Sequence, residues 1–131
     1  MVSDLNLSDK FEIDSAGTSA YHSGHLPDSR MREHAIERGY DLNSKARQFN
    51  PNVDFNKFDY ILTMDNSNYS NVTALASNDN DLKKVYKTTS FCEIHEVDEV
   101  PDPYYGGYDG FELVLDILED ACSGLLKKIN L

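Results

Sequence analysis

The feature that most constrains the fold is an apolar run at residues 60–64, Tyr-Ile-Leu-Thr-Met. A strand that is apolar at nearly every position is buried on both faces, which is typical of a parallel sheet covered by helices on both sides. Asp65 and the polar residues 66–68 follow, and they predict the start of a helix that continues to about Ala76. The segment therefore predicts one strand–helix unit of an α/β fold.

The other predicted elements continue this alternation. Residues 11–14 alternate apolar and polar side chains and predict a short strand, whereas residues 85–91 predict a weaker one. Helices are predicted between Asp28 and Gly39 and, more briefly, at residues 53–58. Strands that alternate with helices in this way indicate a parallel sheet.

The clearest single element is the predicted C-terminal helix at residues 109–129. Asp109 and Glu112 have the spacing of a capping box, and apolar side chains recur along the helix at steps of three and four. Because the chain has 131 residues and shows no repeat or linker, we expect it to fold as one domain, residues 1–131.

The charge balance excludes several classes of partner. The chain carries 23 acidic and 12 basic residues, which gives a formal net charge of −11. Nucleic acid and anionic membrane surfaces repel such a protein, so we expect neither as a partner. No apolar run approaches the roughly 18 residues of a membrane span, and residues 1–6 show no secretory signal. Cys92 and Cys122 are expected to be reduced, as in a cytoplasmic protein.

The segment that is most informative about function is residues 100–107, Val-Pro-Asp-Pro-Tyr-Tyr-Gly-Gly. Pro101 and Pro103 fix the backbone on both sides of Asp102. A carboxyl group that must be held at a set distance from a bound group gains from such stiffness, whereas a solvent-exposed loop does not. Acidic residues at positions 96–99 would raise the pKa of Asp102, which is the direction that a general acid needs. The alternative is a proline-rich turn that exposes its tyrosines.

This segment, with the amphipathic helix that follows it, resembles the acid loop of the low-molecular-weight protein tyrosine phosphatases. Three further stretches resemble that family in order and spacing: residues 14–18 with Tyr21, residues 45–48, and residues 58–65 with Asn68. The resemblance extends over essentially the whole chain. It implies a three-layer flavodoxin-like fold, in which a parallel sheet has helices on both faces.

The resemblance also implies roles for individual residues. Asp102 would protonate the leaving phenolate, because a phenol has a pKa of about 10 and is costly to expel as the anion, and would later activate water. Tyr104 and Tyr105 would form one wall of the substrate cleft, and Tyr21 the facing wall. Ser15 would support the phosphate-binding loop from behind. The implied substrates are phosphotyrosine proteins and small aryl phosphates, cleaved through a cysteinyl-phosphate without a cofactor or metal.

The nucleophile of that family is a cysteine in a Cys-x5-Arg loop, and this sequence contains no such loop. Asp98 stands six positions after Cys92, and Lys128 stands six positions after Cys122. Cys92 lies among acids that would raise its pKa, and Cys122 is predicted on the buried stripe of the last helix, so both are expected to be structural.

We therefore expect a domain that lacks its first strand and its phosphate loop, with residues 1–7 as the tail of the first helix. In the flavodoxin-like strand order the lost strand is central. If the truncation is real, a second copy of the chain or a strand-donating partner would have to complete the sheet.

Several interpretations stay open at this point. The chain is expected to be inactive alone, although the family that it resembles hydrolyses phosphotyrosine. A non-catalytic pseudophosphatase would bind a protein through its cleft or its open sheet edge. An arsenate reductase on the same scaffold would need extra redox cysteines, and the paired tyrosines favour the phosphatase. Asp65 is expected either to cap the following helix or to support the site. A third interpretation, a receiver-like domain phosphorylated on Asp65, is weak because it would need an acidic pair and a later Lys in receiver order.

Overall fold

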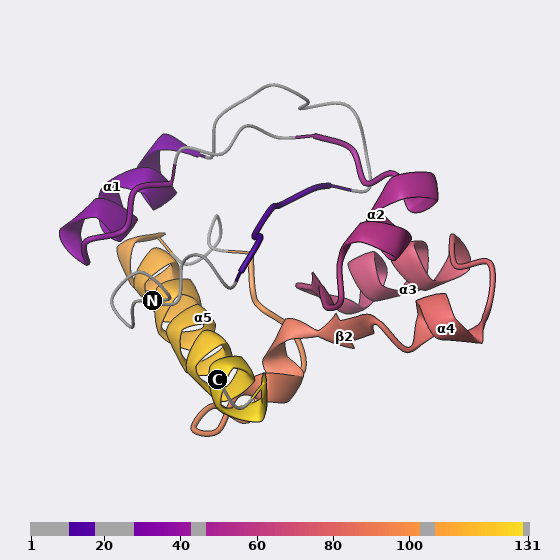
Figure 1. Cartoon of the computed structure of the whole chain (residues 1–131). Coiled ribbons are helices and arrows are strands. Elements are labelled where there is room, and N and C mark those ends of the chain that lie inside the picture. Colours follow the sequence, from indigo (N-terminus) through magenta and orange to yellow (C-terminus); the bar gives the residue numbers. More distant parts are fainter. Residues whose placement is uncertain (1–10, 18–27, 43–46, 103–106, 130–131) are drawn as a thin grey trace.

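Short strands alternate with helices along the chain, as the sequence predicts. The structure is a computed structural model, and it describes residues 11–17, 28–42, 47–102 and 107–129 (Figure 1). In chain order the elements are α1 (Ser29–Glu37), α2 (Pro51–Lys57), β1 (Ile61–Thr63), α3 (Asn66–Ala74), α4 (Asp79–Leu82), β2 (Val85–Lys87), the 3-10 helix η2 (Thr88–Phe91) and α5 (Gly107–Ile129).

Within the apolar run at residues 60–64, Ile61–Thr63 form β1, which pairs in parallel with β2. The predicted burial on both faces is wrong, because Tyr60 and Met64 are exposed and β1 has a single partner strand in the described sheet. Ile61 lies opposite Val85, and Thr63 lies opposite Lys87. The chain leaves β1, passes through α3 and α4, and returns to β2 alongside its starting strand. The predicted α/β class with a parallel sheet is confirmed.

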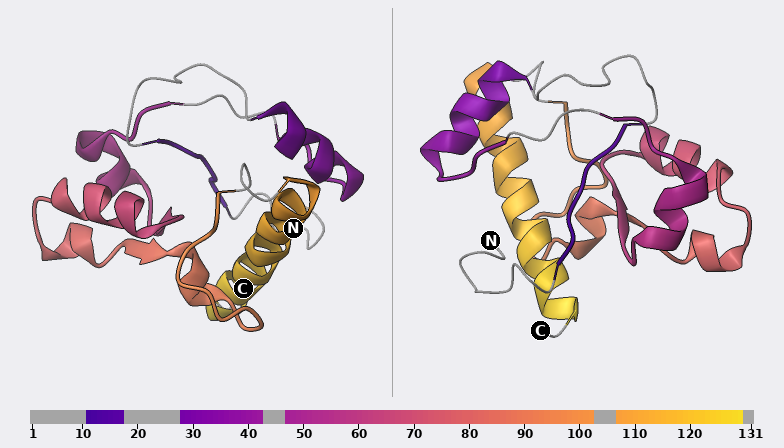
Figure 2. Two further views of the ribbon diagram at one scale, coloured as in Figure 1. Left: turned by 180° about the vertical axis from the view of Figure 1, so that it is seen from behind. Right: turned by 45° about the horizontal axis from the view of Figure 1, so that its top comes forward.

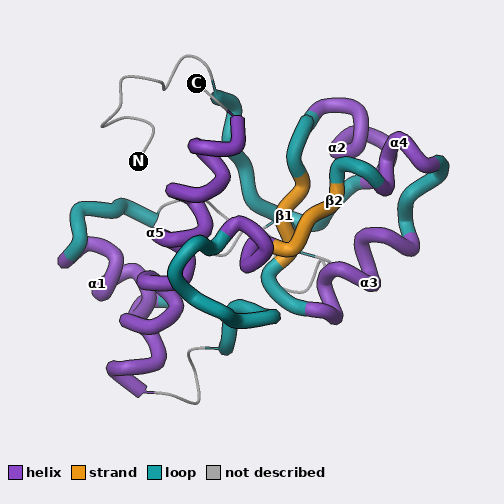
Figure 3. Tube along the Cα trace, turned by 90° about the horizontal axis from the view of Figure 1, so that it is seen from below, coloured by secondary structure: helices purple, strands orange, loops and turns teal. Residues whose placement is uncertain are grey.

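Helices gather at two sides of the strands. In Figure 1 and Figure 3, α2, α3 and α4 lie together at one side, and α1 and α5 lie at the other. The buried apolar residues follow the same division: Phe55, Val72 and Val85 pack between the strands and the first group of helices, and Phe111, Val114, Leu115, Ile117 and Ala121 lie buried along α5.

Polar side chains begin the helices where the sequence places them. Asp28 caps α1, and Asp65 caps α3 by accepting the backbone N–H of Asn68 at 2.7 Å. Gly39 has a positive φ of 87° and donates its N–H to the carbonyl of Ile36 at 2.9 Å, which ends α1. Of the two roles expected for Asp65, helix capping is the one with a hydrogen bond in the structure.

Of the predicted strands, one is absent and one is shorter than expected. Residues 11–14 form no strand, and the only pairing of this segment among the described residues is an isolated parallel bridge between Gly17 and Gln48. A strand needs a hydrogen-bonded neighbour on at least one side, and no described strand lies beside residues 11–14. The strand predicted at residues 85–91 ends at Lys87 and continues as η2.

The C-terminal helix differs from its prediction at two points. It begins at Gly107, so Asp109 and Glu112 lie inside it and do not form the expected capping box. Glu112 instead contacts α1, as described below. Cys122 is exposed although the apolar periodicity placed it on the buried stripe, because the buried face passes through its neighbour Ala121.

A close approach between backbones fixes α5 against η2. A Cβ atom added at Gly124 would lie 1.9 Å from the carbonyl oxygen of Phe91, which is far inside van der Waals contact. Only glycine allows the helix to approach the η2 backbone this closely. Residues 11–17 lie between α5 and the group formed by α2, α3 and α4 in both views of Figure 2.

The sequence shows no apolar run long enough to span a membrane, and the described helices can be compared with that prediction. A membrane-spanning helix needs about 20 predominantly apolar residues. None of the helices that the structure describes meets that requirement.

Candidate active site

Asp102, the predicted general acid, is exposed and ends the long segment that follows η2. Two hydrogen bonds hold the residues just before it at the end of β1. The N–H of Val100 donates to the carbonyl of Met64 at 2.8 Å, and Glu99 Oε2 accepts the N–H of Asn66 at 2.7 Å. These contacts place the start of the predicted acid loop at the carboxyl end of a parallel strand, which is the edge where α/β proteins bind their ligands.

Asp98 adds a second attachment, to β2. Its carboxylate pairs with Lys87 Nζ at 2.6 Å and accepts from Asn66 Nδ2 at 2.9 Å, while its backbone carbonyl accepts the hydroxyl of Thr89 at 2.8 Å. The hydrogen bond from Lys87, followed by that from Asn66, holds the pKa of Asp98 below its usual value. One of the acids close to Asp102 is therefore ionised and paired with a cation of the sheet.

The other end of the segment is attached to α5 by Asp120. This carboxylate is almost fully buried and accepts the consecutive backbone N–H groups of Glu93, Ile94 and His95 at 2.8–3.3 Å. It also contacts Nδ1 of His95 at 2.8 Å. Burial alone would raise the pKa of Asp120, but these donors outweigh it and lower the pKa well below its usual range.

Ser15, the predicted support for the phosphate loop, is exposed and lies in the segment of residues 11–17. Its backbone N–H donates to the carboxylate of Asp14 at 2.8 Å, and Asp14 in turn pairs with Arg47 Nε at 3.0 Å. The backbone of Gly17 exchanges hydrogen bonds with residues 47–49, at 2.8 Å to the carbonyl of Arg47 and at 2.7 Å from the N–H of Phe49.

Arg47 joins residues 11–17 to α2. Its guanidinium binds both carboxylate oxygens of the buried Asp54 at 3.0 and 3.1 Å, and Asp54 also accepts the N–H of Asn50 at 2.8 Å. Burial acts to raise the pKa of Asp54, and the bonds from Arg47 and Asn50 more than reverse that effect, so the pKa is lowered. The bidentate pair fixes the direction in which Arg47 reaches Asp14.

The structure does not bring all of the predicted site residues together. Tyr21, Tyr104 and Tyr105 lie outside the described residues, so only Asp102 and Ser15 of that set have described positions. Cys92 is half-buried, and its Sγ lies 3.7 Å from the carbonyl of Ile117. Burial raises the pKa of the Cys92 thiol, and Asp120 raises it further, which agrees with a structural role.

Sequence reasoning missed Arg47, Asp54 and Asp120 as anchoring residues. The signal for Asp120 was present, because an acid occurs among the buried apolar positions of the C-terminal helix. The described residues also hold a group of side chains that could bind a metal ion: His34, Glu37 and Glu112 on α1 and α5. None of these three belongs to the predicted catalytic set.

Comparisons with known proteins indicate one family. A family model described as "Low molecular weight phosphotyrosine protein phosphatase" matches residues 1–131. The chain is 47% identical over 129 residues to a low molecular weight protein-tyrosine-phosphatase homologue of Synechocystis sp., which covers 98% of this chain and 82% of that protein. It is 32% identical over 130 residues to the low molecular weight phosphotyrosine protein phosphatase of Homo sapiens, covering 99% and 82%.

Solved structures give the same result in three dimensions. The crystal structure of a protein tyrosine phosphatase from Entamoeba histolytica, with Hepes in its active site, superposes with a TM-score of 0.92 at 44% identity, covering 98% of this chain and 81% of that chain. A Drosophila arginine phosphatase superposes with a TM-score of 0.85 at 30% identity, covering 99% and 83%.

Proposed function

The chain belongs to the low molecular weight phosphotyrosine protein phosphatase family, and we propose that it acts in the hydrolysis of protein phosphotyrosine and related aryl phosphate monoesters. The observation that carries the proposal is the match of the family across residues 1–131 together with the position of Asp102. That carboxyl group stands at the end of a segment attached to the carboxyl edge of the sheet.

In this proposal, Asp102 is the general acid. It donates its proton to the leaving phenolate oxygen as the phosphorus–oxygen bond breaks, and it then takes a proton from the water that hydrolyses the phosphoenzyme. The bonds of Val100 and Glu99 to the end of β1 support this role, because they limit the positions that Asp102 can occupy. Tyr104 and Tyr105 on one wall, and Tyr21 on the other, are proposed to contact the aromatic ring of the substrate.

The nucleophile is the limiting part of the proposal. Neither Cys92 nor Cys122 precedes an arginine at the required spacing, and the raised pKa of Cys92 disfavours its thiolate. We therefore propose that residues 1–131 alone do not hydrolyse phosphotyrosine and that a Cys-x5-Arg loop must be supplied by a further segment or by a strand-donating partner, with Ser15 supporting that loop. A cytoplasmic location, where thiols stay reduced, suits such chemistry.

The first test measures hydrolysis of p-nitrophenyl phosphate by the 131-residue chain with its mass verified. We expect no turnover above buffer. Turnover that disappears in the Asp102→Asn variant would contradict the proposed inactivity of the chain alone, although it would support the role of Asp102.

The second test supplies the nucleophile. An apolar strand and a Cys-x5-Arg loop of the family pattern are fused ahead of Met1, and we expect the fusion to hydrolyse phosphotyrosine peptide. Asp102→Asn in this fusion should lower kcat by about 10²–10⁴-fold, which is the usual contribution of a general acid. The matched control is Asp109→Asn, an exposed aspartate in the first turn of α5, for which kcat should stay within about twofold. Equal loss in both variants would contradict the assignment.

The same fusion tests substrate class. Because the Drosophila relative is an arginine phosphatase, phosphoarginine is the comparison substrate. The proposal expects a higher kcat/KM for phosphotyrosine, and the opposite order would overturn the assignment of an aryl phosphate as substrate.

A further inference from the structure

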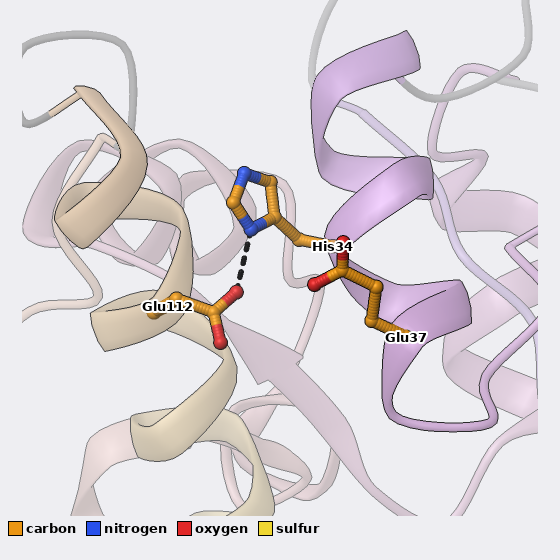
Figure 4. A group of neighbouring side chains, drawn as sticks. All are labelled: His34, Glu37 and Glu112. Carbon is orange, nitrogen blue, oxygen red and sulfur yellow. Dashed lines mark hydrogen bonds and ion pairs between the residues drawn. The ribbon is translucent and has the colours of Figure 1, made fainter.

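Side chains of α1 and α5 converge at a place that the proposed chemistry does not use. His34 and Glu37 are three residues apart on α1 and therefore lie on the same side of that helix. Glu112 approaches them from α5, and Figure 4 shows the imidazole and the two carboxylates facing the space between the helices. One nitrogen or oxygen atom from each of the three lies within 4.8 Å of the others.

We propose that His34, Glu37 and Glu112 bind a divalent transition-metal ion of the zinc type, which joins α1 to α5. One imidazole nitrogen and two carboxylates are a ligand set that such ions accept, with a further position open to water. Magnesium and calcium prefer an all-oxygen set, so the histidine favours zinc over them. The site is structural, and it is separate from the metal-free hydrolysis proposed above.

The histidine is already oriented for this role. Its side chain is only 11% exposed, and its ring stacks on Phe111 with centroids 5.1 Å apart and planes 13° apart. Nδ1 faces Glu112 Oε2 at 2.5 Å. Zinc bonds near 2.1 Å in a tetrahedral arrangement separate two ligand atoms by about 3.4 Å. The two groups therefore need to open by only about 1 Å to admit an ion between them.

The charges around the cluster favour a cation even though Arg38 lies beside it. Arg38 pairs with Glu112 Oε1 at 2.9 Å, with Asp116 at 2.9 Å and with Glu119 at 2.6 Å. Arg38 occupies one oxygen of Glu112 and leaves the other directed at His34.

Glu37 supplies the remaining negative charge. It is exposed at the end of α1, and no ion pair joins it to another residue in the described part of the chain. Three carboxylates pair with Arg38, and Glu37 adds a fourth negative charge at the cluster. Arg30 lies over the Phe111 ring, 5.2 Å from its centroid, so two guanidinium groups stand near four carboxylates, and a divalent ion would balance the excess. The Glu37 carboxylate already lies within 4.8 Å of the ligand atoms of His34 and Glu112, so rotation of the exposed side chain can bring it to the ion.

The test titrates Zn²⁺ into the full 131-residue chain by calorimetry, in a background in which Cys92→Ser and Cys122→Ser remove the thiols as competing ligands. We expect one ion per chain and a rise in Tm with added zinc. Glu37→Gln should weaken zinc binding by about tenfold or more and reduce the rise in Tm at the same zinc concentration, because it removes one ligand. Mg²⁺ at the same concentration should give neither signal.

The matched control is Glu33→Gln. Glu33 is also an exposed glutamate of α1, so its replacement removes the same charge from the same helix without touching the cluster. Zinc affinity should change less than about twofold in this variant. Equal affinity in Glu33→Gln and Glu37→Gln would overturn the proposal, and so would the absence of zinc binding by the parent. Neither measurement depends on phosphatase activity, so failure here leaves the proposed function untouched.

Discussion

Two segments next to the proposed site, residues 11–17 and residues 93–100, are similar in exposure and different in attachment. Each carries an apolar side chain in solvent, with Ile13 73% exposed and Ile94 81% exposed. Residues 93–100 are bonded to α5, to the end of β1 and to β2. Residues 11–17 are joined to residues 47–49 by one backbone bridge and the Asp14–Arg47 pair, and to the end of α2 by the Glu12–Lys57 pair.

This difference shows which contacts determine the position of an irregular segment that buries little apolar surface. Burial of side chains gives such a segment little stability, so acceptors for its backbone N–H groups decide where it lies. Asp120 accepts three of them in succession from inside the protein. Residues 11–17 contact a buried carboxylate only indirectly. Asp14 pairs with Arg47, and Arg47 is held in turn by the buried Asp54.

The largest effect is expected from Gly124→Ala. The new methyl group would meet the Phe91 carbonyl at 1.9 Å, so α5 must move away from η2 and carry Asp120 with it. We expect the free energy of unfolding to fall by about 3 kcal/mol or more, measured by urea denaturation, although alanine is intrinsically the better helix former. Ser123→Ala is the control and should change stability little. A Gly124→Ala protein as stable as the parent would show that the close approach is not required.

A smaller effect, confined to the other segment, is expected from Asp54→Asn. This change leaves Arg47 without its buried carboxylate, so the free energy of unfolding should fall by about 1–2 kcal/mol. Hydrogen exchange should speed up at the amides of Gly17 and Phe49 and stay unchanged at that of Ile94. The exposed Asp59→Asn is the matched control. Faster exchange at Ile94 in Asp54→Asn would mean that the two segments are not held independently.

The smallest effect is expected in the dependence of Tm on pH. Because the pKa of Asp120 is lowered in the folded protein, the unfolded chain takes up a proton at higher pH than the folded one does. The contribution of Asp120 is therefore complete above its ordinary pKa near 3.8 and is lost as the pH falls further. Between pH 5 and 3, the Tm of Asp120→Asn should fall less than that of the parent.

The control for this comparison is Asp109→Asn, since Asp109 is exposed on the same helix. Its Tm should follow the parent across the same pH range. If Asp120→Asn and the parent lose the same number of degrees, hydrogen bonding of the Asp120 carboxylate does not contribute to acid sensitivity. The experiment thus separates the attachment of residues 93–95 from the general effect of protonating a protein with a net charge of −11.

Features that depend on neighbouring residues were predictable from the sequence. The caps of α1 and α3 at Asp28 and Asp65, and the end of α1 at Gly39, follow from local preferences and are present. The apolar run at residues 60–64 correctly indicated a parallel strand. The start of α5 was predicted two residues late, because the spacing of Asp109 and Glu112 imitates a cap while Glu112 in fact contacts α1.

Features that join distant residues were not predictable in this way. Asp120 bonds residues 25–27 positions earlier, and local propensity says nothing about such pairs. Residues 11–14 have the alternation of a strand, but alternation cannot reveal whether a partner strand lies beside them in space. The role of Asp102 came from a resemblance and from two prolines, and it stays a prediction until its kinetics are measured.

The length of α5 connects the predicted acid loop to the contact with η2. Its 23 residues form a rod of about 35 Å, at 1.5 Å per residue. The rod begins at Gly107, the last residue of the predicted acid loop, and Glu112 lies five residues further on, about 7.5 Å along the axis. Near the far end, Gly124 rests on η2. An ion at Glu112 and a substitution at Gly124 would therefore both act on the helix that begins with the last residue of the predicted acid loop.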